Sequence, residues 1–542
     1  MKNTPRIWLL SSFVIALLMT TPIWVLVTFL FEPGNENWQH LINTLLPDYI
    51  LNSILLMLGV SVGTLLLGVP TAWLISHYEF WGRKWLQWAL LLPLAMPAYI
   101  TAYTYTGVLE FEGPVQSLLR EIVNPNVSSW FPEIRSLGGA ILLFSFVLYP
   151  YVYLLSRSAF GSQSQQALDV SKTLGVSPFK SFWLIAIPMA RPAIIAGVTL
   201  ALMETLADFG AVQHFGVDTF TTGIYRTWSG LGDTTTAAQL SLILLIFVAT
   251  LIAIERWSRK QQRYFTSDNH SQTHTLVKLP SRKANMAFAI CFFPILIGFL
   301  IPSLQLLYWS MTTAESNLNS DFFNLIFNSL SLALITALVT LVIALLLAYS
   351  KRLSPSKWIK QSVQLSHFGY AIPGTVLAIA ILIPLAGLDK LIDDFFYNHY
   401  QISTGLIFSG TLFALVMAYT IRFLSVALQS IESGLQQIKP SMDDSAKTLG
   451  ASNWQRLKQI HIPLLQSSLL TALILVFVEV LKELPTTLIL RPFNFDTLAI
   501  RAYEMAADER LADAGLPALL IVLTSLIPVI FLSKLMEKNQ HA

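Results

Sequence analysis

The sequence is poor in charged residues and has almost no cysteine. Only 12% of its 542 residues are charged, whereas soluble domains carry about 25%. The net charge of +3 is too small to indicate a nucleic-acid partner. A single cysteine, Cys291, excludes an internal disulfide and lacks the spaced partners of a zinc site. The chain also has no Gly-Lys dipeptide, and therefore no phosphate-binding P-loop. No cluster of nucleophiles or metal ligands indicates an enzyme or a bound cofactor.

Long apolar runs take the place of charge. Hydrophobic residues make up 54% of the chain, and a helix needs about 20 apolar residues to cross a bilayer. These runs predict an all-α membrane protein with twelve spans, of which the first is too long for a signal-peptide core. The predicted spans cover residues 7–31, 50–77, 85–107, 138–155, 192–212, 238–255, 286–310, 328–349, 358–386, 405–427, 467–490 and 515–533.

Positive charge predicts how these spans are oriented, because cytoplasmic loops hold the excess of Lys and Arg. With the N-terminus inside, 25 of the 34 Lys and Arg residues fall in cytoplasmic segments and seven in outer loops. The reverse orientation would invert this ratio. We therefore expect a multi-pass protein with both termini in the cytoplasm.

An internal repeat divides the chain into two similar halves. The text SKTLGVSPFKSFWLIAIP at 171–188 returns as AKTLGASNWQRLKQIHIP at 446–463. Six spans per half is an even number, so both halves insert the same way up. We expect parallel repeats related by a pseudo-twofold axis along the membrane normal. The expected parts are a first repeat at 1–256, a polar and basic cytoplasmic linker at 257–285, and a second repeat at 286–542.

The duplicated text forms two polar segments, residues 169–188 and 444–463. Each opens with an aspartate that we expect to cap a short helical turn. A glycine then permits a positive φ and ends the turn, and a second helical piece runs to Ile-x-Ile-Pro, where proline interrupts regular helix. The pattern predicts a helix, a sharp turn and an angled re-entry into the membrane. The residues concerned are Asp169, Gly175 and Pro188, with Asp444, Gly450 and Pro463 in the second segment.

Both polar segments resemble the EAA loop of ABC-importer permeases, which reads Glu-Ala-Ala, three residues, Gly, nine residues and Ile-x-Leu-Pro. This chain has Asp for Glu, Val170 or Ser445 for the first Ala, and Ile for Leu. In that family the loop is the coupling helix, which docks in a groove of the cytoplasmic ATPase. The resemblance implies a type I importer fold with two ATPase subunits. The matching residues are Asp169, Ser171, Gly175, Ile185, Pro188, Asp444, Ala446, Gly450, Ile460 and Pro463.

Ionisable residues lie in the span after each polar segment, and such residues indicate function because their burial is costly. Glu204 and Asp208 match Glu479 and Glu483, and each pair is spaced i,i+4, which predicts one shared helix face. Carboxylate oxygens suit hard, highly charged cations. These four acids and Lys482 are therefore candidates for a translocation path. The alternative is structural: Lys482 neutralises an acidic neighbour, and the other acids stabilise packing or end their helices.

Two further stretches resemble the fused permeases of bacterial ferric-iron ABC importers: METLADFGAVQHFGVDTFTTGIYRTW and KELPTTLILRPFNFDTLAIRAYEMAADERLADAGLPAL. The resemblance implies an inner-membrane protein that receives Fe(III) from a periplasmic binding protein. Fused thiamine permeases share the architecture, so thiamine or another small solute is the alternative substrate. An ion-gradient-driven transporter is the alternative mechanism, but it leaves the two polar segments unexplained. Matching outer-loop residues are expected either to dock the binding protein or to cap helices: Arg226, Asp233, Arg501 and Asp508.

Overall fold

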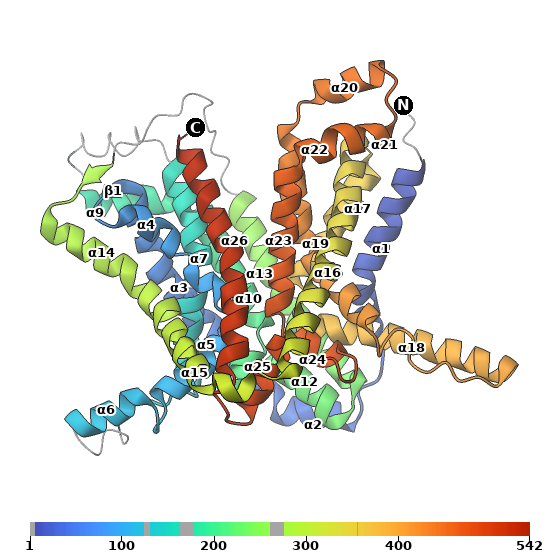
Figure 1. Ribbon diagram of the computed structural model, residues 1–542, viewed down its shortest axis with the longest axis horizontal. Helices are drawn as coiled ribbons and strands as arrows, with labels where there is room; N and C mark the ends of the chain where they lie inside the picture. Colours follow the sequence, from blue (N-terminus) through green and yellow to red (C-terminus); the bar gives the residue numbers. More distant parts are fainter. Residues whose placement is uncertain are drawn as a thin grey trace. The chain divides into compact units, whose positions relative to one another are not determined.

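The computed structural model describes residues 6–123, 130–162, 175, 177–260, 276–354 and 356–541, and these are almost entirely helical (Figure 1). Nine helices in this part of the chain are long and apolar enough to cross a membrane, or eleven if each of two sharply bent pairs is one span. A shorter apolar helix, Gly515–Ile530, coincides with the last predicted span. The prediction of an all-α, multi-pass protein is confirmed.

Several predicted spans are broken rather than continuous. Where one span is predicted over 85–107, Arg83–Ala95 and Ala98–Ile122 meet at 91°. The break precedes Pro97. Met96 has an extended backbone, because a proline disfavours helical geometry in the residue before it. Pro373 breaks the predicted span 358–386 in the same way. A bend of 76° between Asn453–Leu464 and Gln466–Lys482 follows the second polar segment and lies just before the predicted span 467–490.

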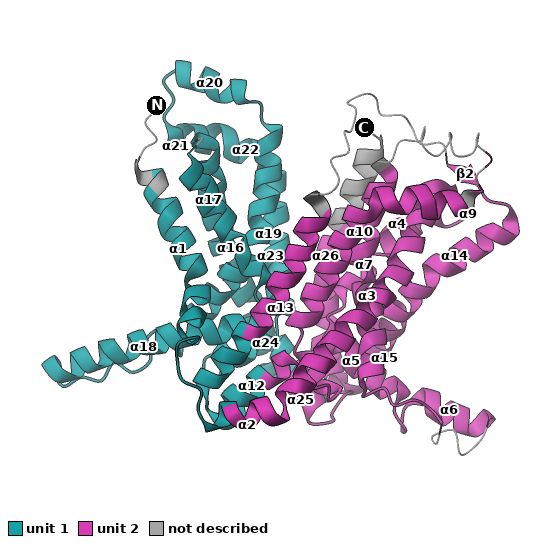
Figure 2. Cartoon of the chain, turned by 180° about the vertical axis from the view of Figure 1, so that it is seen from behind, with its two compact units in different colours: residues 1–38, 224–242, 316–501 teal, residues 39–223, 243–315, 502–542 magenta. Residues whose placement is uncertain are grey.

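The chain folds into two compact units (Figure 2). Unit 1 holds residues 1–38, 224–242 and 316–501, and unit 2 holds 39–223, 243–315 and 502–542. Each unit therefore combines most of one sequence repeat with the first membrane helix of the other repeat. The repeat boundaries at 1–256 and 286–542 describe the duplication of the sequence, which is a different division from the compact units.

Unit 1 is centred on α16, which packs against α19 and α23. The N-terminal helix α1 packs against α16, α17 and α18 of the same unit. The elements of unit 1 are α1 (Arg6–Thr28), α16 (Ser320–Leu353), α17 (Lys357–Ser366), η5 (Phe368–Ala371), α18 (Gly374–Tyr400), α19 (Leu412–Gln437), α20 (Pro440–Thr448), α21 (Asn453–Arg456), η6 (Leu457–His461), α22 (Ile462–Leu464), α23 (Gln466–Lys482) and α24 (Pro485–Leu490).

Unit 2 is centred on α3, which packs against α7 and α10. Glycine allows this close approach: a Cβ added to Gly197 of α10 would lie 2.7 Å from Val152 Cα of α7. Its elements are α3 (Leu46–His77), β1 (Tyr78–Glu79), α4 (Arg83–Ala89), η1 (Leu92–Ala95), α5 (Ala98–Leu109), α6 (Pro114–Ile122), α7 (Leu137–Ser162), α9 (Pro178–Ser181), η3 (Phe182–Ala186), α10 (Ile187–Ala207), α11 (Gly210–His214), β2 (Val277–Lys278), α14 (Ser281–Ile295), η4 (Leu296–Leu300), α15 (Ile301–Asn317) and α26 (Gly515–His541).

Among the described residues, the last two residues of α15 belong to unit 1, four further helices cross the division between the units, and a strand pair lies in unit 2. The crossing helices are α2 (Glu36–Thr44), α12 (Phe220–Leu231), α13 (Thr234–Lys260) and α25 (Leu498–Ala507). Strands β1 and β2 pair in parallel, so the end of the predicted linker is tied back to the segment that follows α3.

Candidate functional site

The second polar segment has the predicted shape of a helix, a turn and an angled re-entry. Helix α20 begins with Pro440 at its first turn, where the missing N–H costs no hydrogen bond. It ends in a Schellman motif: Ala451 N–H donates to Ala446 O and Gly450 N–H to Lys447 O, both at 3.0 Å. Gly450 has φ +83°, so the predicted role of this glycine in ending the helix is confirmed.

The predicted cap at Asp444 is wrong. Helix α20 begins at Pro440, with Lys439 as its N-cap residue, so Asp444 lies inside the helix. Its carboxylate is 72% exposed and pairs with Lys447 Nζ at 3.3 Å. An exposed pair of this kind contributes about 0–1 kcal/mol. Asp444 therefore adds little to the stability of the turn and presents its charge to solvent.

A π-helix precedes the proline of each polar segment, a feature that the sequence analysis did not identify. Proline lacks an N–H and its ring crowds the carbonyl four residues earlier, and the wider π-turn relieves this clash. Pro188, Pro302 and Pro463 all follow such a turn. In each case the isoleucine before the proline donates to a carbonyl five residues back: Ile187 to Phe182, Ile301 to Leu296 and Ile462 to Leu457.

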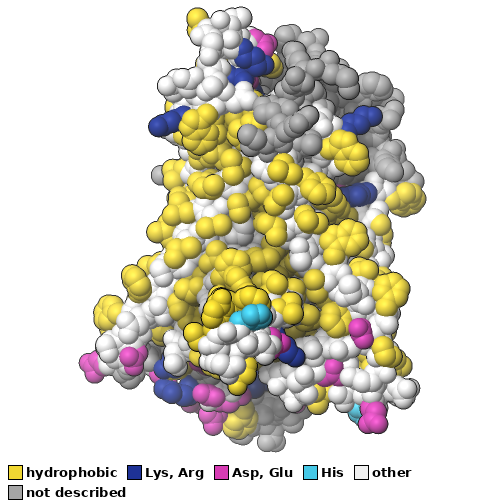
Figure 3. All heavy atoms as spheres, turned by 90° about the vertical axis from the view of Figure 1, so that its right-hand side faces the viewer, with side chains coloured by type: hydrophobic (Ala, Val, Ile, Leu, Met, Phe, Trp, Pro, Cys, Tyr) yellow, Lys and Arg dark blue, Asp and Glu magenta, His cyan; other side chains and the backbone are white. Residues whose placement is uncertain are grey.

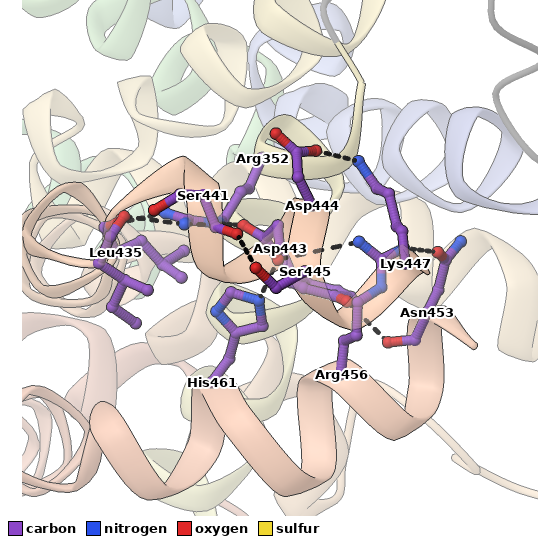
Figure 4. A network of polar contacts seen from close by, with 12 residues as sticks. Arg352, Leu435, Ser441, Asp443, Asp444, Ser445, Lys447, Asn453, Arg456 and His461 are labelled. Atoms are coloured by element: carbon purple, nitrogen blue, oxygen red, sulfur yellow. Dashed lines mark hydrogen bonds and ion pairs between the residues drawn. The ribbon is translucent and has the colours of Figure 1, made fainter. Parts of the chain in front are cut away.

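A buried network of charges holds the second polar segment against the rest of unit 1 (Figure 4). Asp443 Oδ2 accepts from Arg352 Nε at 2.8 Å, and Asp443 Oδ1 lies 2.8 Å from His461 Nε2. Arg456 Nη1 approaches the same carboxylate at 3.8 Å. Arg352 at the end of α16 also donates to the carbonyls of Leu435 and Ile438. Asp443 thus joins α16, α20 and η6.

The environment of Asp443 favours its charged form. Burial alone would raise the pKa of this carboxyl, but the hydrogen bonds from His461 and Arg352 outweigh burial and lower the pKa. The repeat pattern in the sequence indicates the neighbouring Asp444 and does not indicate Asp443. A signal was available, because the second segment has adjacent aspartates where the first has Leu168 and Asp169.

Aromatic side chains pack beside the described part of the first polar segment. Trp73 stacks on His77 with ring centroids 3.6 Å apart, and it lies 5.0 Å from Phe182 of η3 and 5.2 Å from Phe160. Gly175 has φ +74°, in agreement with its predicted role. Asp169 and Ser171 lie outside the described residues.

Both polar segments expose large apolar side chains. Leu449 is 87% exposed and Trp454 is 62% exposed in the second segment. Trp183 is 55% exposed and Leu184 is 69% exposed in the first. The motif residues Ile185 and Ile460 are half-buried, and Ala446 is buried. These exposed side chains provide an apolar contact surface beside charged groups such as Asp444.

The predicted shared face of the membrane acids is wrong, because each helix ends between its two acids. Helix α10 stops at Ala207, and Asp208 is extended with ψ 138°. Helix α23 stops at Lys482, and Glu483 is extended with ψ 119°. Glu204 stays on its helix, half-buried.

The second acid of each pair instead starts the short helix that follows the break. Asp208 Oδ1 accepts from Ala211 N–H at 2.9 Å, at the start of α11. Glu483 Oε1 accepts from Thr486 N–H at 3.1 Å, at the start of α24. A carboxylate is favourable at a helix N-terminus. Asp208 and Glu483 therefore each stabilise the start of the next helix rather than the end of their own.

Two cations of unit 1 neutralise its membrane acids. Lys482 Nζ lies 2.8 Å from Glu479 Oε1, as the structural alternative predicts. Arg422 Nη1 lies 3.6 Å from Glu483 Oε1, and both side chains are at most 10% exposed. The sequence placed Arg422 within an apolar run without assigning it a partner. In the described part of the chain no group of three or more His, Cys, Asp or Glu side chains is arranged to hold a metal ion.

The four outer-loop candidates have different surroundings. Asp233 caps α13: its Oδ1 accepts from Thr236 N–H at 3.0 Å, and its Oδ2 accepts from the amides of Asn35 and Asn37. Burial would raise the pKa of Asp233, but these hydrogen bonds lower it to about 2. The remaining three, Arg226, Arg501 and Asp508, are exposed.

The duplicated helical module and the paired polar segments are typical of a membrane permease. The chain belongs to the family described as binding-protein-dependent transport system inner membrane component, and the family model matches twice, at residues 64–261 and 341–540. The two matches confirm the internal repeat. The protein is thus a multi-pass inner-membrane component of ABC importers, and its relatives are permeases rather than enzymes.

Several known permeases resemble the chain. The Fe(3+)-transport system permease protein FbpB 2 of Haemophilus influenzae is 26% identical over 543 residues, which is 98% of this chain and 99% of the relative. The inner membrane ABC transporter permease protein YdcU of Escherichia coli is 25% identical over 40% of this chain and 73% of its own length. The molybdenum transport system permease protein ModB of Haemophilus influenzae is 24% identical over 39% of this chain and 95% of its own length.

Proposed function

We propose that this chain is the fused permease of an ATP-driven importer, and that it moves ferric iron from a periplasmic binding protein into the cytoplasm. The support for iron is the full-length similarity to a permease named for Fe(3+) transport. The similarity to the molybdenum permease extends over only 39% of this chain. The expected orientation places both polar segments and both termini in the cytoplasm.

The observation that carries this proposal is the exposed surface of the second polar segment. Leu449 and Trp454 are well exposed at the turn after α20, next to the exposed Asp444–Lys447 pair. Apolar side chains presented together with charges are typical of a protein-binding surface. We assign this surface, and its counterpart around Trp183, to two cytoplasmic ATPase subunits. Closure of the ATPases would then move the two segments as rigid elements.

The translocation path is proposed to use Glu204 and Glu479, which are partly exposed on membrane helices. Glu479 is paired with Lys482, so a cation that binds there must compete with the lysine. Asp208 and Glu483 would shape the path indirectly, because each fixes the start of a short helix. Arg226 and Arg501, both exposed, are the proposed contacts for the binding protein, and such charges affect the encounter rate more than the affinity.

Uptake of radioactive iron tests the proposed substrate. We expect a strain without this chain to lose ATP-dependent uptake of Fe(III) and to regain it when the chain is restored, with thiamine uptake unchanged. Uptake of thiamine instead of iron would overturn the substrate. Uptake that survives ATP depletion but stops when the ion gradient is dissipated would overturn the ATP-driven mechanism.

Substitution of Gly450 tests the proposed coupling role. A side chain here meets no atom within 4 Å, so only the positive φ opposes it. We expect Gly450→Val to cost about 1–2 kcal/mol at the turn and to uncouple ATP hydrolysis from uptake. Gly450→Asn is the matched control, because Asn tolerates positive φ, and it should retain most uptake. Normal coupling in Gly450→Val, with correct insertion, would contradict the role of the turn.

A further inference from the structure

The last part of α18 leaves the body of unit 1 as an arm. The first half of this helix is buried, up to Leu385, whereas its end is exposed. The arm comprises residues 388–410, which are the end of α18 and the loop that returns beside it. Figures 1 and 2 show α18 running crosswise to the long helices α1 and α16, at the end of unit 1 opposite α20.

Two aspartates fix the loop of the arm to its helix. Asp389, which is 1% exposed, accepts hydrogen bonds from the N–H groups of Ile407, Phe408 and Ser409 at 2.8–3.1 Å. Asp393 accepts from Thr404 N–H at 2.6 Å and from Gly405 N–H at 3.2 Å. The arm is therefore a built structure, although few other elements support it.

The helix of the arm is amphipathic, with an exposed apolar stripe. Positions i, i+3, i+4, i+7 and i+8 fall on one helix face, and these positions in the arm are all apolar. The opposite face carries charge and amide groups. The stripe consists of Leu388, Leu391, Ile392, Phe395 and Phe396, and the polar face includes Lys390, Asp394 and Asn398. Leu391 is 68% exposed and Phe395 is 52% exposed.

Unit 2 has an arm at the matching place in its sequence repeat. Helix α6 comes directly after α5, just as the exposed end of α18 comes directly after the buried half of α18. Helix α6 also projects from unit 2 (Figure 1). Its exposed apolar residues are again spaced by one helical turn: Leu118 is 55% exposed and Ile122 is 72% exposed. Glu121 and Arg120 lie beside them. The feature therefore occurs in both halves of the duplicated chain.

We infer that the arm of α18 lies in the membrane–water interface, with its apolar stripe in the lipid. Amphipathic helices bind this region with their apolar face among the acyl chains and their polar face in water. Tyr400, which is exposed, follows Phe396 by one helical turn at the edge of the stripe, and tyrosine is enriched at membrane interfaces.

The position of the arm favours lipid over a soluble partner. Figure 3, which views the side from which α18 projects, shows apolar side chains across the middle of this face and charged side chains towards its top and bottom. Helix α18 packs against α1, whose Leu17 is 53% exposed and Trp24 62% exposed. A stripe that carries no charge and belongs to a helix packed against such an exposed apolar helix fits acyl chains.

Spin labels on opposite faces of the arm test this inference in the full chain. Phe395→Cys lies on the stripe, and Asp394→Cys lies on the polar face. Cys291 is buried and can be replaced by Ala to leave one labelling site. In vesicles of neutral lipid without other proteins, we expect oxygen to relax the label at 395 several-fold more than a water-soluble nickel complex does. The label at 394 should show the reverse order.

A second pair, Leu391→Cys and Lys390→Cys, keeps the test valid if one variant does not fold. The label on the stripe should remain protected at high salt, because no charge pair is involved. Equal access of the nickel complex to both faces would overturn the inference. That result would instead indicate a water-exposed stripe available to a soluble protein. The pair Ile122→Cys and Glu121→Cys extends the same measurement to α6.

Discussion

The described parts of the two polar segments share backbone features but differ in the side chains that pack beside them. Gly175 and Gly450 both have positive φ, and a π-helix followed by Ile-Pro leads into the membrane in both halves. In the second half Asp443 binds Arg352 and His461. The corresponding residues of the first half, judged by the repeat offset, include Leu168, Ser76 and Ala186.

In the described part of the first half, aromatic rings pack beside the re-entry. Trp73, Phe160 and Phe182 surround the start of the re-entry in the first half. At the matching positions the second half has Tyr349, Leu435 and Leu457. Within the described residues, the repeat keeps the same glycine turn and π-helix, whereas the side chains packed beside them include an aromatic cluster in the first copy and a charge network in the second. Each contact type can be broken separately.

The largest effect is expected from loss of Asp443. Asp443→Ala leaves the buried Arg352, Arg456 and His461 without their shared carboxylate, and breaking such a network costs on the order of 3 kcal/mol. We expect a clearly lower apparent unfolding temperature of the purified chain in detergent. Because the folded pKa of Asp443 lies below its ordinary value, this contribution is present at neutral pH and is lost as pH falls through the folded pKa.

Asp444→Ala is the matched control for Asp443, since it removes the adjacent carboxylate on the same helix. The exposed Asp444–Lys447 pair should contribute about 0–1 kcal/mol, so unfolding should change little. Reduced ATPase binding by Asp444→Ala with normal stability would assign this residue to the partner surface. Equal destabilisation by the two substitutions would contradict the ionic network.

The next largest effect is expected from Trp73→Ala in the first half. This change removes the stack on His77 and the contacts with Phe160 and Phe182, and for this half-buried side chain we expect a loss of about 2 kcal/mol. The loss should not depend on salt, in contrast to that of Asp443→Ala. Trp73→Phe should retain part of the stability. Thermal unfolding of both variants at low and high ionic strength measures this difference. If Trp73→Ala and Asp443→Ala lost stability with the same dependence on salt, the proposed difference between aromatic and ionic contacts would be wrong.

Much of the architecture can be predicted from the sequence because its signals are local. Apolar runs identify the spans, and the glycine of each polar segment identifies a turn with positive φ. The ion pair between Arg352 and Asp443 joins residues 91 apart, which no local pattern indicates. The breaks at Asp208 and Glu483 depend on short helices that interrupt otherwise apolar runs. The exchange of first helices between units is equally hidden, because hydropathy identifies an apolar helix but not its neighbour.

The smallest effect concerns the matched outer-loop acids. Asp233 caps α13, so Asp233→Ala should cost about 1 kcal/mol, whereas Asp508→Ala should change little because Asp508 is exposed. The folded pKa of Asp233 is about 2, below the ordinary 3.8, so its charge stabilises the fold above pH 4 and loses this effect as pH falls towards 2. Thermal unfolding at pH 7 and pH 3 should therefore show a narrower gap between wild type and Asp233→Ala at the lower pH. If the difference in unfolding temperature between wild type and Asp233→Ala did not change with pH, the cap would act through neutral hydrogen bonds alone. If Asp233→Ala and Asp508→Ala lowered the stability equally, the two acids would contribute equally to their outer loops.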